Sequence, residues 1–125
     1  MTYNVMVFAA RKLGITHEQF KTRYEQHMRM VEEICGDAMP LSHTRWYTRH
    51  EGVDDKPVLL AGNVDERHYD VVVLMVFEDE AAFAKFYGAL LTEEANARIE
   101  ADEAGFWDRD RMQVVVIGDV KETRK

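Results

Sequence analysis

Apolar residues recur along the chain in two periods, which predict strands and helices in the order β-α-β-β-α-β. Extended patterns cover residues 3–10, 41–50, 68–77 and 112–120, which we expect to be the four strands. After the first of them, buried positions return at spacings of four and three, the period of a helix with one apolar stripe. That stripe consists of Phe20, Tyr24, His27, Val31 and Ile34. A second helical stretch follows the third strand and carries Phe83, Phe86, Tyr87 and Leu90.

Capping residues mark the expected ends of the helices. Thr16 followed by Gln19 is a capping box, and Gly36 is well placed to end the same helix. Asp79 can cap the helix after the third strand, and Thr92 can cap a further one. The face of that further helix is marked by Ile99, Asp102 and Phe106.

Two of the strands are almost wholly apolar, at residues Val71–Phe77 and 114–117. An antiparallel sheet with one face in water shows alternation, so unbroken apolar runs imply that both faces are covered. The chain has helices enough for one face only. We therefore expect the other face to pack on a second copy of the sheet or to enclose a ligand cavity.

The second strand differs from these, because neither of its faces is apolar throughout. One face carries His43, Arg45, Tyr47 and Arg49, and the other carries Ser42, Thr44, Trp46 and Thr48. The connection after it, residues 51–67, is rich in Gly, Pro and acidic residues, and we expect it to be long and irregular. Within it, residues 58–61 are apolar enough to fold over a cavity or to form a short extra strand.

The order of elements is that of a ferredoxin-like α+β sandwich, with helices on one side of a four-stranded antiparallel sheet. Two such sheets face to face make a dimeric α+β barrel, which would cover the apolar strands. We expect a single domain over residues 1–125, since this length supports one hydrophobic core. We expect that domain to form a homodimer because the apolar strands need a cover.

Composition narrows the classes of partner. The chain is 46% hydrophobic and 31% charged, as in globular proteins, and its formal net charge of −7 with scattered basic residues argues against nucleic acid and anionic membranes. The apolar stretch 5–10 is too short for a signal peptide, and no segment approaches membrane-spanning length, so we expect a cytoplasmic protein. Cys35 is the only cysteine, which excludes an internal disulfide.

Several short motifs resemble the EthD domain family over nearly the whole chain. They are Tyr-Glu-Gln-His-Met at 24–28, Gly-Asp at 36–37, Pro-Leu-Ser-His-Thr-Arg at 40–45 with Tyr47 two further on, and Asp-Glu at 102–103 with Phe106. The segment 8–16, with its Arg-Lys and its Gly-Ile-Thr helix entry, is similar too. The resemblance implies the dimeric barrel strongly. It implies a reaction only weakly, namely the dehydration, decarboxylation or cyclisation that fungal members are assigned in aromatic polyketide pathways.

The candidate chemistry rests on two ionisable groups on apolar helix stripes, His27 and Asp102. A charge held there needs a partner or a shifted pKa. If the two helices pack side by side, the carboxylate can hold the imidazole tautomer, and the pair can abstract a proton next to a carbonyl. The alternative for His27 is a core residue that is hydrogen-bonded to a tyrosine or a carbonyl, and Asp102 alternatively caps a turn or pairs with Arg98 or Arg109.

Further candidate residues lie on the second strand. His43 is a third candidate catalytic group, and Arg45 and Tyr47 on the same face are candidates to bind the substrate oxygen, although this face would equally suit an interfacial salt-bridge ladder. Tyr24 and Trp46 complete the substrate-binding candidates, and either can instead be a structural aromatic residue. We expect His17 and His68 to be solvated and Glu93, Glu94, Glu100 and Glu103 to form an exposed helix face.

We expect neither a metal nor a cofactor. No two histidines have the i, i+4 spacing of a helical metal site, and no phosphate loop or dinucleotide fingerprint occurs. Similar barrels can hold haem, for which His27 could be an axial ligand. Two hypotheses follow: a cofactor-independent lyase or cyclase acting on an aromatic polyketide-like ketone, with a cofactor-free oxygenase as a variant, or a non-catalytic module that binds a hydrophobic metabolite.

Overall fold

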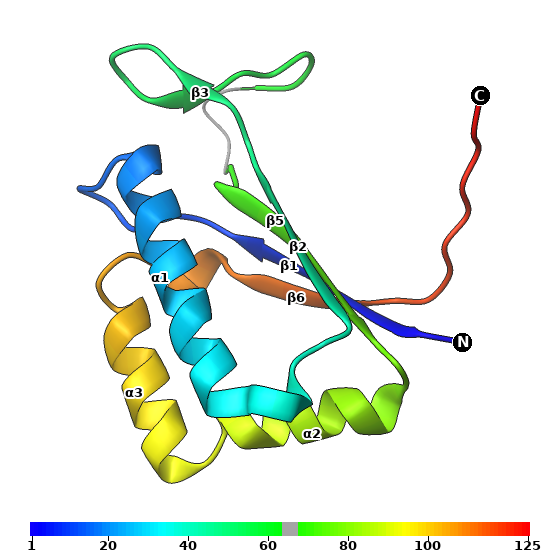
Figure 1. The fold of residues 1–125 in the computed structure, drawn as a ribbon. Coiled ribbons are helices and arrows are strands. Elements are labelled where there is room, and N and C mark those ends of the chain that lie inside the picture. The colour runs from blue at the N-terminus through cyan, green and yellow to red at the C-terminus, as the bar shows by residue number, and fades with distance from the viewer. Residues whose placement is uncertain (64–67) are drawn as a thin grey trace.

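A four-stranded antiparallel sheet with three helices on one side forms the body of the protein (Figure 1). The computed structural model describes residues 1–63 and 68–125. The strands are β1 (Tyr3–Ala9), β2 (Ser42–Tyr47), β5 (Val71–Phe77) and β6 (Gln113–Ile117), in the spatial order β2-β5-β1-β6. The helices are α1 (His17–Cys35), α2 (Glu80–Leu90) and α3 (Glu93–Glu103). This arrangement confirms the ferredoxin-like α+β sandwich.

The helices begin at the predicted capping residues. Gln19 N donates to Thr16 Oγ1 over 3.0 Å, and Thr16 N donates to Gln19 Oε1 over 2.9 Å, so the capping box is complete. Asp79 accepts a hydrogen bond from Ala82 N at the start of α2, and Thr92 Oγ1 accepts one from Ala95 N at the start of α3. Gly36 ends α1 with a φ of 48°, a left-handed angle that glycine adopts without strain.

The core lies between the sheet and the helices. In antiparallel pairing, residues opposite each other share a face, and Val5 and Val7 of β1 face Met75 and Val73 of β5. The buried residues of these strands pack against Phe20, Tyr24, Met28 and Val31 of α1 and against Phe86 of α2. This layer buries the stripe of α1 that the sequence predicts, and His27 lies within it.

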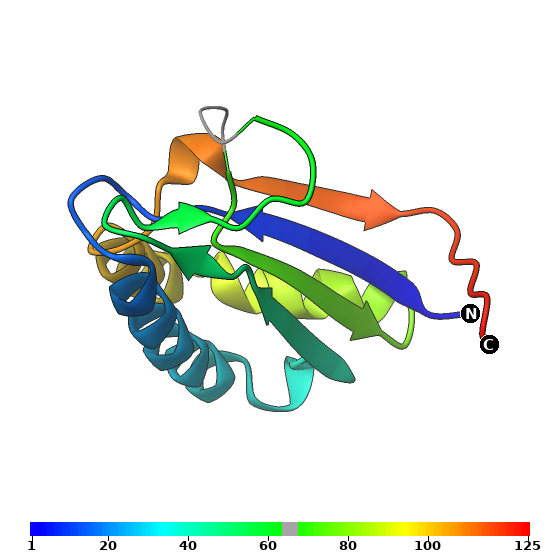
Figure 2. The ribbon, with the colours of Figure 1, turned by 90° about the horizontal axis from the view of Figure 1, so that it is seen from above.

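The other side of the sheet carries no helix, as the view from above shows (Figure 2). Its residues, which we call the open face, are Asn4, Met6, Phe8, Ser42, Thr44, Trp46, Val72, Leu74, Val76, Gln113, Val115 and Ile117. On the edge strand β6, Val114, Val115 and Val116 are about half exposed. Of the two apolar strands, β5 thus has one face buried in the chain and one uncovered, whereas β6 is largely exposed on both faces.

The connection after β2 differs from the prediction in detail. β2 ends at Tyr47, and His50 begins a separate strand, β3 (His50–Glu51), which pairs with β4 (Lys56–Pro57). The extra strand therefore precedes residues 58–61, which are exposed and do not cover a cavity. Residues 64–67 of this connection lie outside the described part of the chain. None of the helices in the described ranges has the length and apolarity to cross a membrane.

Candidate functional site

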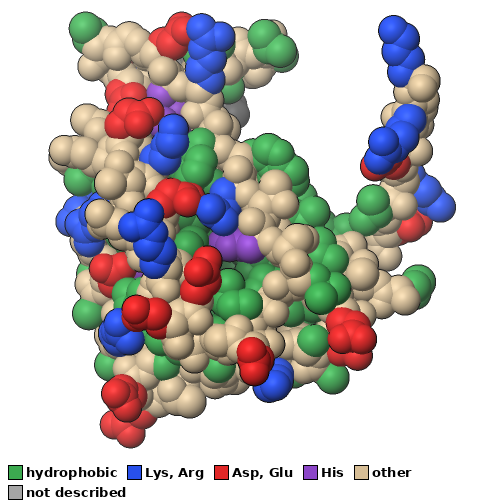
Figure 3. All heavy atoms as spheres, in the orientation of Figure 1, with side chains coloured by type: hydrophobic (Ala, Val, Ile, Leu, Met, Phe, Trp, Pro, Cys, Tyr) green, Lys and Arg blue, Asp and Glu red, His purple; other side chains and the backbone are tan. Residues whose placement is uncertain are grey.

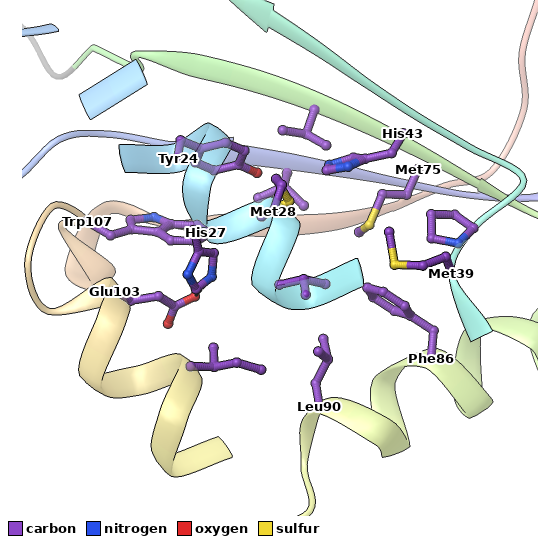
Figure 4. A pocket seen from close by; sticks show the side chains of 15 residues that line it. Tyr24, His27, Met28, Met39, His43, Met75, Phe86, Leu90, Glu103 and Trp107 are labelled. Atoms are coloured by element: carbon purple, nitrogen blue, oxygen red, sulfur yellow. Dashed lines mark ion pairs between the residues drawn. The ribbon is translucent and has the colours of Figure 1, made fainter. Parts of the chain in front are cut away.

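An apolar pocket of about 110 Å³ lies between the helix layer and the sheet. Its walls come from all three helices, from β1, β2 and β5, and from the segment after α3. Most of the lining is apolar, including Val7, Met28, Val31, Met75 and Ile99. Five polar side chains also reach it, namely Tyr24, His27, His43, Glu103 and Trp107 (Figure 4). A few polar groups in an apolar pocket are typical of small-molecule sites.

His27 forms the polar centre of this pocket together with two carboxylates of α3. Its Nδ1 lies 2.7 Å from Asp102 Oδ2, and its Nε2 lies 3.4 Å from Glu103 Oε2. His27 is 1% exposed, whereas the Asp102 side chain is 30% exposed and lies behind the ring, away from the pocket. Since a carboxylate accepts, Nδ1–H donates to Asp102 and Nε2 becomes the nitrogen on the pocket side.

The two carboxylates are held by arginines. Arg109 forms an ion pair with Glu103, and an Arg23 guanidinium nitrogen lies 3.8 Å from Asp102 Oδ1. These contacts fix both carboxylates relative to the imidazole ring. The structure thus brings His27 and Asp102 into the side-by-side geometry that the sequence predicts.

Glu103 is a site residue that sequence reasoning missed. We expected it on an exposed helix face, but it is buried and lines the pocket. Glu103 follows Ile99 by four residues, so the helical period already places both on one face. That spacing was the available signal, and a run of acidic neighbours obscured it.

Trp107 is the other polar lining residue that the sequence did not single out as functional. It is a buried aromatic of the core, yet it also lines the pocket. Its Nε1 is buried and has no hydrogen-bond partner among the described residues. An indole N–H can only donate, so Trp107 carries a donor that the described residues leave unused.

Tyr24 and His43 lie farther along the pocket from His27, and both point inward (Figure 4). Burial raises the pKa of Tyr24, so its hydroxyl stays protonated and can donate. Burial, together with the nearby Arg45 guanidinium, lowers the pKa of His43 to about 4. His43 is therefore a neutral imidazole near neutral pH.

Arg45 and Tyr47 do not line this pocket. Arg45 Nε and Nη2 donate to the two oxygens of Glu25 over 2.6 and 2.7 Å, and Tyr47 also donates to Glu25. These groups line a shallow neighbouring surface, which also includes His43. In Figure 3, hydrophobic and histidine side chains fill the hollow between α1 and the strands, with charged side chains along its rim. Arg45 and Tyr47 thus bind Glu25 at the rim and are not part of the pocket wall beside His27.

Trp46 lies on the opposite side of the sheet. It belongs to the open face, is 50% exposed and is separated from the pocket by the sheet itself. Alternation along β2 requires this, because His43, Arg45 and Tyr47 point toward the helices. Within one chain Trp46 therefore cannot contact a molecule beside His27.

Haem does not fit this pocket. Pockets for drug-sized ligands occupy roughly 300 to 1,000 Å³, and haem belongs to that range, well above the 110 Å³ found here. His27 Nδ1 is in addition already engaged by Asp102 at 2.7 Å. The residues around His27 suit proton transfer instead.

Comparisons with known proteins agree with the fold. The sequence profile of the EthD domain matches residues 12–110. Among curated proteins, none matches the chain. The solved structures that resemble it include an EthD-like protein from Ralstonia eutropha, with a TM-score of 0.56 and 17% identity over 91% of this chain and 89% of that one.

Two further structures share the fold. One is a dimeric ferredoxin-like protein of unknown function from Jannaschia sp. CCS1, with a TM-score of 0.57 and 13% identity over 95% of this chain and 100% of that one. The other is SnoaB, a cofactor-independent oxygenase from Streptomyces nogalater, with a TM-score of 0.52 and 14% identity over 99% and 97%. Identities this low show a common fold and no more.

Proposed function

The chain belongs to the EthD domain family, and we propose that it is a cofactor-independent enzyme that abstracts a proton next to the carbonyl of a small hydrophobic ketone. The observation that carries this proposal is the position of His27. One ring nitrogen donates to Asp102 while the other lies at the wall of an apolar pocket. A buried imidazole in that position is suited to act as a general base.

The first step transfers one proton to His27 and moves the electron pairs toward the carbonyl oxygen. His27 Nε2 takes the α-proton, the C–H electron pair forms a carbon–carbon double bond, and the carbonyl pair moves onto oxygen as an enolate. Asp102 keeps Nδ1 protonated, so that Nε2 has the free lone pair, and its charge stabilises the imidazolium that forms. Glu103, 3.4 Å from Nε2, adds a second negative charge beside that cation.

Neutral donors are available for the enolate oxygen. Trp107 Nε1–H is buried without a partner among the described residues, and the Tyr24 hydroxyl stays protonated because burial raises its pKa. Fixed donors in an apolar site stabilise developing negative charge more than water does. We therefore assign oxyanion stabilisation to Trp107 and Tyr24 rather than to Arg45, whose guanidinium is engaged by Glu25.

The enolate can then collapse with loss of water. If a hydroxyl group lies β to the carbonyl, it leaves with the proton that His27 holds, the double bond forms, and the imidazole returns to its neutral state. Decarboxylation of a β-keto acid uses the same oxyanion site: carbon dioxide leaves, and His27 in its protonated form returns a proton to carbon. Ring closure by enolate attack on a second carbonyl follows the same pattern.

An oxygenase is a second candidate, which the fold shared with SnoaB favours. Here the carbanion reduces molecular oxygen, and a CH₂ group becomes a carbonyl while the second oxygen atom leaves as water. Oxygen is the co-reactant, and the proton abstraction is the same. Oxygen uptake therefore distinguishes the two reactions, but not the role of His27.

The pocket limits the part of the substrate that is enclosed. A cavity of about 150 Å³ binds benzene in an engineered protein, so the 110 Å³ here encloses at most about one ring or a short acyl chain. A larger, polyketide-like molecule would insert one ring and leave the rest near the rim of Glu25, Arg45 and Tyr47. The lining favours an aromatic or aliphatic portion without charge.

We also propose that the functional unit is a homodimer joined through the open face. Met6, Phe8, Val72 and Leu74 form an apolar surface there that one chain leaves uncovered. Large exposed apolar surfaces of this kind mark interaction sites. The dimeric ferredoxin-like protein from Jannaschia offers a precedent for association in this fold.

The test compares the wild-type protein with His27→Gln, using β-hydroxy aryl ketones of one or two rings. General base catalysis contributes about 100- to 10,000-fold, so we expect His27→Gln to lower kcat by at least about 100-fold while ligand binding persists. His68→Gln, which alters a histidine outside the pocket, is the matched control and should retain activity.

Two results would contradict the enzyme. If the wild-type protein binds these ketones but neither converts them nor consumes oxygen, the chain is a binding module. If His27→Gln turns over as fast as the wild-type protein, another residue is the base.

A further inference from the structure

A second buried polar group lies at the start of α1, whereas His27 lies in the middle of that helix. It contains His17, the first residue of α1, His50, the first residue of β3, and Asp70, which directly precedes β5. His17 and Asp70 are each 4% exposed, and so is the His50 side chain. The sequence predicts a solvated His17, and the structure shows that this residue is buried instead. None of the three residues lines the pocket around His27.

We propose that His17, His50 and Asp70 bind one divalent transition-metal ion, with Zn²⁺ as the preferred ion. Two imidazoles and one carboxylate from separate elements form a donor set that Zn²⁺ uses, with a fourth position left for water. The spacing of histidines in the sequence gave no indication of this group, because only the fold brings the residues together.

The distances fit a common ion. His17 Nδ1 lies 2.7 Å and His50 Nε2 lies 3.5 Å from Asp70 Oδ1, and one ligand atom from each residue lies within 4.8 Å of the others. Two ligand atoms that are each about 2.1 Å from a zinc ion lie roughly 3.4 Å apart at a tetrahedral angle. The two rings are stacked with centroids 3.7 Å apart, so at least one ring must turn about its Cβ–Cγ bond for both lone pairs to meet at the ion.

The tautomer of His50 supports a cation at this place. His50 Nδ1 lies 3.1 Å from the carbonyl oxygen of Thr48, which can only accept a hydrogen bond. In the neutral ring Nδ1 therefore carries the hydrogen, and Nε2 directs a lone pair toward Asp70 Oδ1. Two buried acceptors that face each other repel, and a cation between them satisfies both.

Neighbouring groups hold the carboxylate and set the local charge. Arg11 N donates to Asp70 Oδ2 over 2.8 Å, which leaves Oδ1 facing the two rings. Arg11 forms an ion pair with Asp55, and Asp55 accepts from His17 N over 2.7 Å. Arg11 Nε also lies 3.9 Å from Asp70 Oδ1. With neutral rings, the three charged side chains in direct contact, Asp55, Asp70 and Arg11, sum to one negative charge, and Lys12, Lys56 and Arg111 lie farther out along the adjoining cavity.

An ion can reach the cluster from outside. A cavity of about 300 Å³ adjoins it and is lined by His50, Asp55 and Asp70, among others. This cavity gives an entry path and room for a water ligand, both of which a metal site requires. A bound ion would tie the hairpin of β3 and β4 to the start of α1 and to β5, apart from the pocket around His27.

The test is calorimetric titration of the tag-free protein with Zn²⁺. We expect about one ion per chain, a rise in Tm on binding, and release of protons as the ion displaces the hydrogen on His17 Nδ1. His50→Gln should weaken binding by at least about 100-fold. His50→Cys supplies a thiolate at the same position and should restore binding, which separates loss of a ligand from loss of folding. His43→Gln, which changes a histidine of the other site, should bind Zn²⁺ as the wild type does.

Co²⁺ serves as a second probe in place of Zn²⁺. We expect it to bind at the same stoichiometry and to show a visible absorption band that reports nitrogen and oxygen ligands. The proposal is overturned if the wild-type protein binds no Zn²⁺, or if His50→Gln and the wild-type protein bind it equally well. It is also overturned if the His43→Gln control loses binding as strongly as His50→Gln does.

Discussion

Replacing His43 by Gln should change how the stability of the protein depends on pH. Burial and the Arg45 guanidinium lower the pKa of His43 to about 4 in the folded protein, from its ordinary value of 6.5. The unfolded chain therefore takes up this proton at higher pH than the folded chain does. Stability from the neutral His43 is complete above pH 6.5 and is lost as the pH falls toward about 4.

The size of the effect follows from the shift. The lowering of the His43 pKa from 6.5 to about 4 corresponds to about 3 kcal/mol of folding free energy if it is fully expressed. His43 is partly exposed, and its imidazole shares the rim with Arg45 and Glu25, so solvent screening reduces the value. We expect about 1.5 kcal/mol. Gln cannot titrate, so the difference in free energy of unfolding between the wild-type protein and His43→Gln should shift by this amount between pH 7 and pH 4.

The assay is urea unfolding followed by far-ultraviolet circular dichroism at several pH values and one protein concentration. Carboxylates titrate in both proteins, so their contribution cancels in the difference, provided that the m values agree. Wild-type and variant curves that stay parallel from pH 7 to pH 4 would refute the burial of a neutral His43. The same pKa predicts that an acid limb of the pH–rate profile above pH 5 does not come from His43.

Two further predictions concern the pair of His27 and Asp102 and the open face. Asp102→Asn keeps the shape of the side chain but lets the His27 ring adopt the other tautomer. In steady-state turnover, kcat should therefore fall by at least about 100-fold with little change in KM. An unchanged kcat would show that Asp102 is only a structural partner. Leu74→Glu places a charge in the middle of the open face and should give monomers in sedimentation velocity, whereas a dimer that survives this change associates through another surface.

Local signals in the sequence were sufficient for most of the fold. Thr16, Asp79 and Thr92 begin helices because their side chains satisfy backbone amides a few residues away, and such contacts can be read from short spacings. Alternation in β2 also correctly separated the faces of Arg45 and Trp46. It could not reveal that Glu25 of α1 binds Arg45, because that contact depends on how the helix crosses the strand.

The sequence predicted the site only for residues on the apolar stripes of two helices that pack against each other. His27 and Asp102 each lie on an apolar stripe, and two helices on one side of a small sheet have few ways to pack. The group around Asp70 had no such signal, since His17 lies 53 residues away from it and no common period connects the two. Such clusters are set by topology, and a sequence without its fold gives no distance between them.

The most direct test of proton abstraction is the incorporation of deuterium from heavy water into the α-position of a ketone, followed by NMR. Acetophenone and related aryl ketones of one or two rings are suitable probes, because one ring matches the pocket around His27. We predict exchange with the wild-type protein that is faster than in buffer and falls at least about 100-fold in His27→Gln. Exchange at the same rate in the two proteins, or no exchange above buffer for ketones that are shown to bind, would contradict the role of His27 as the base.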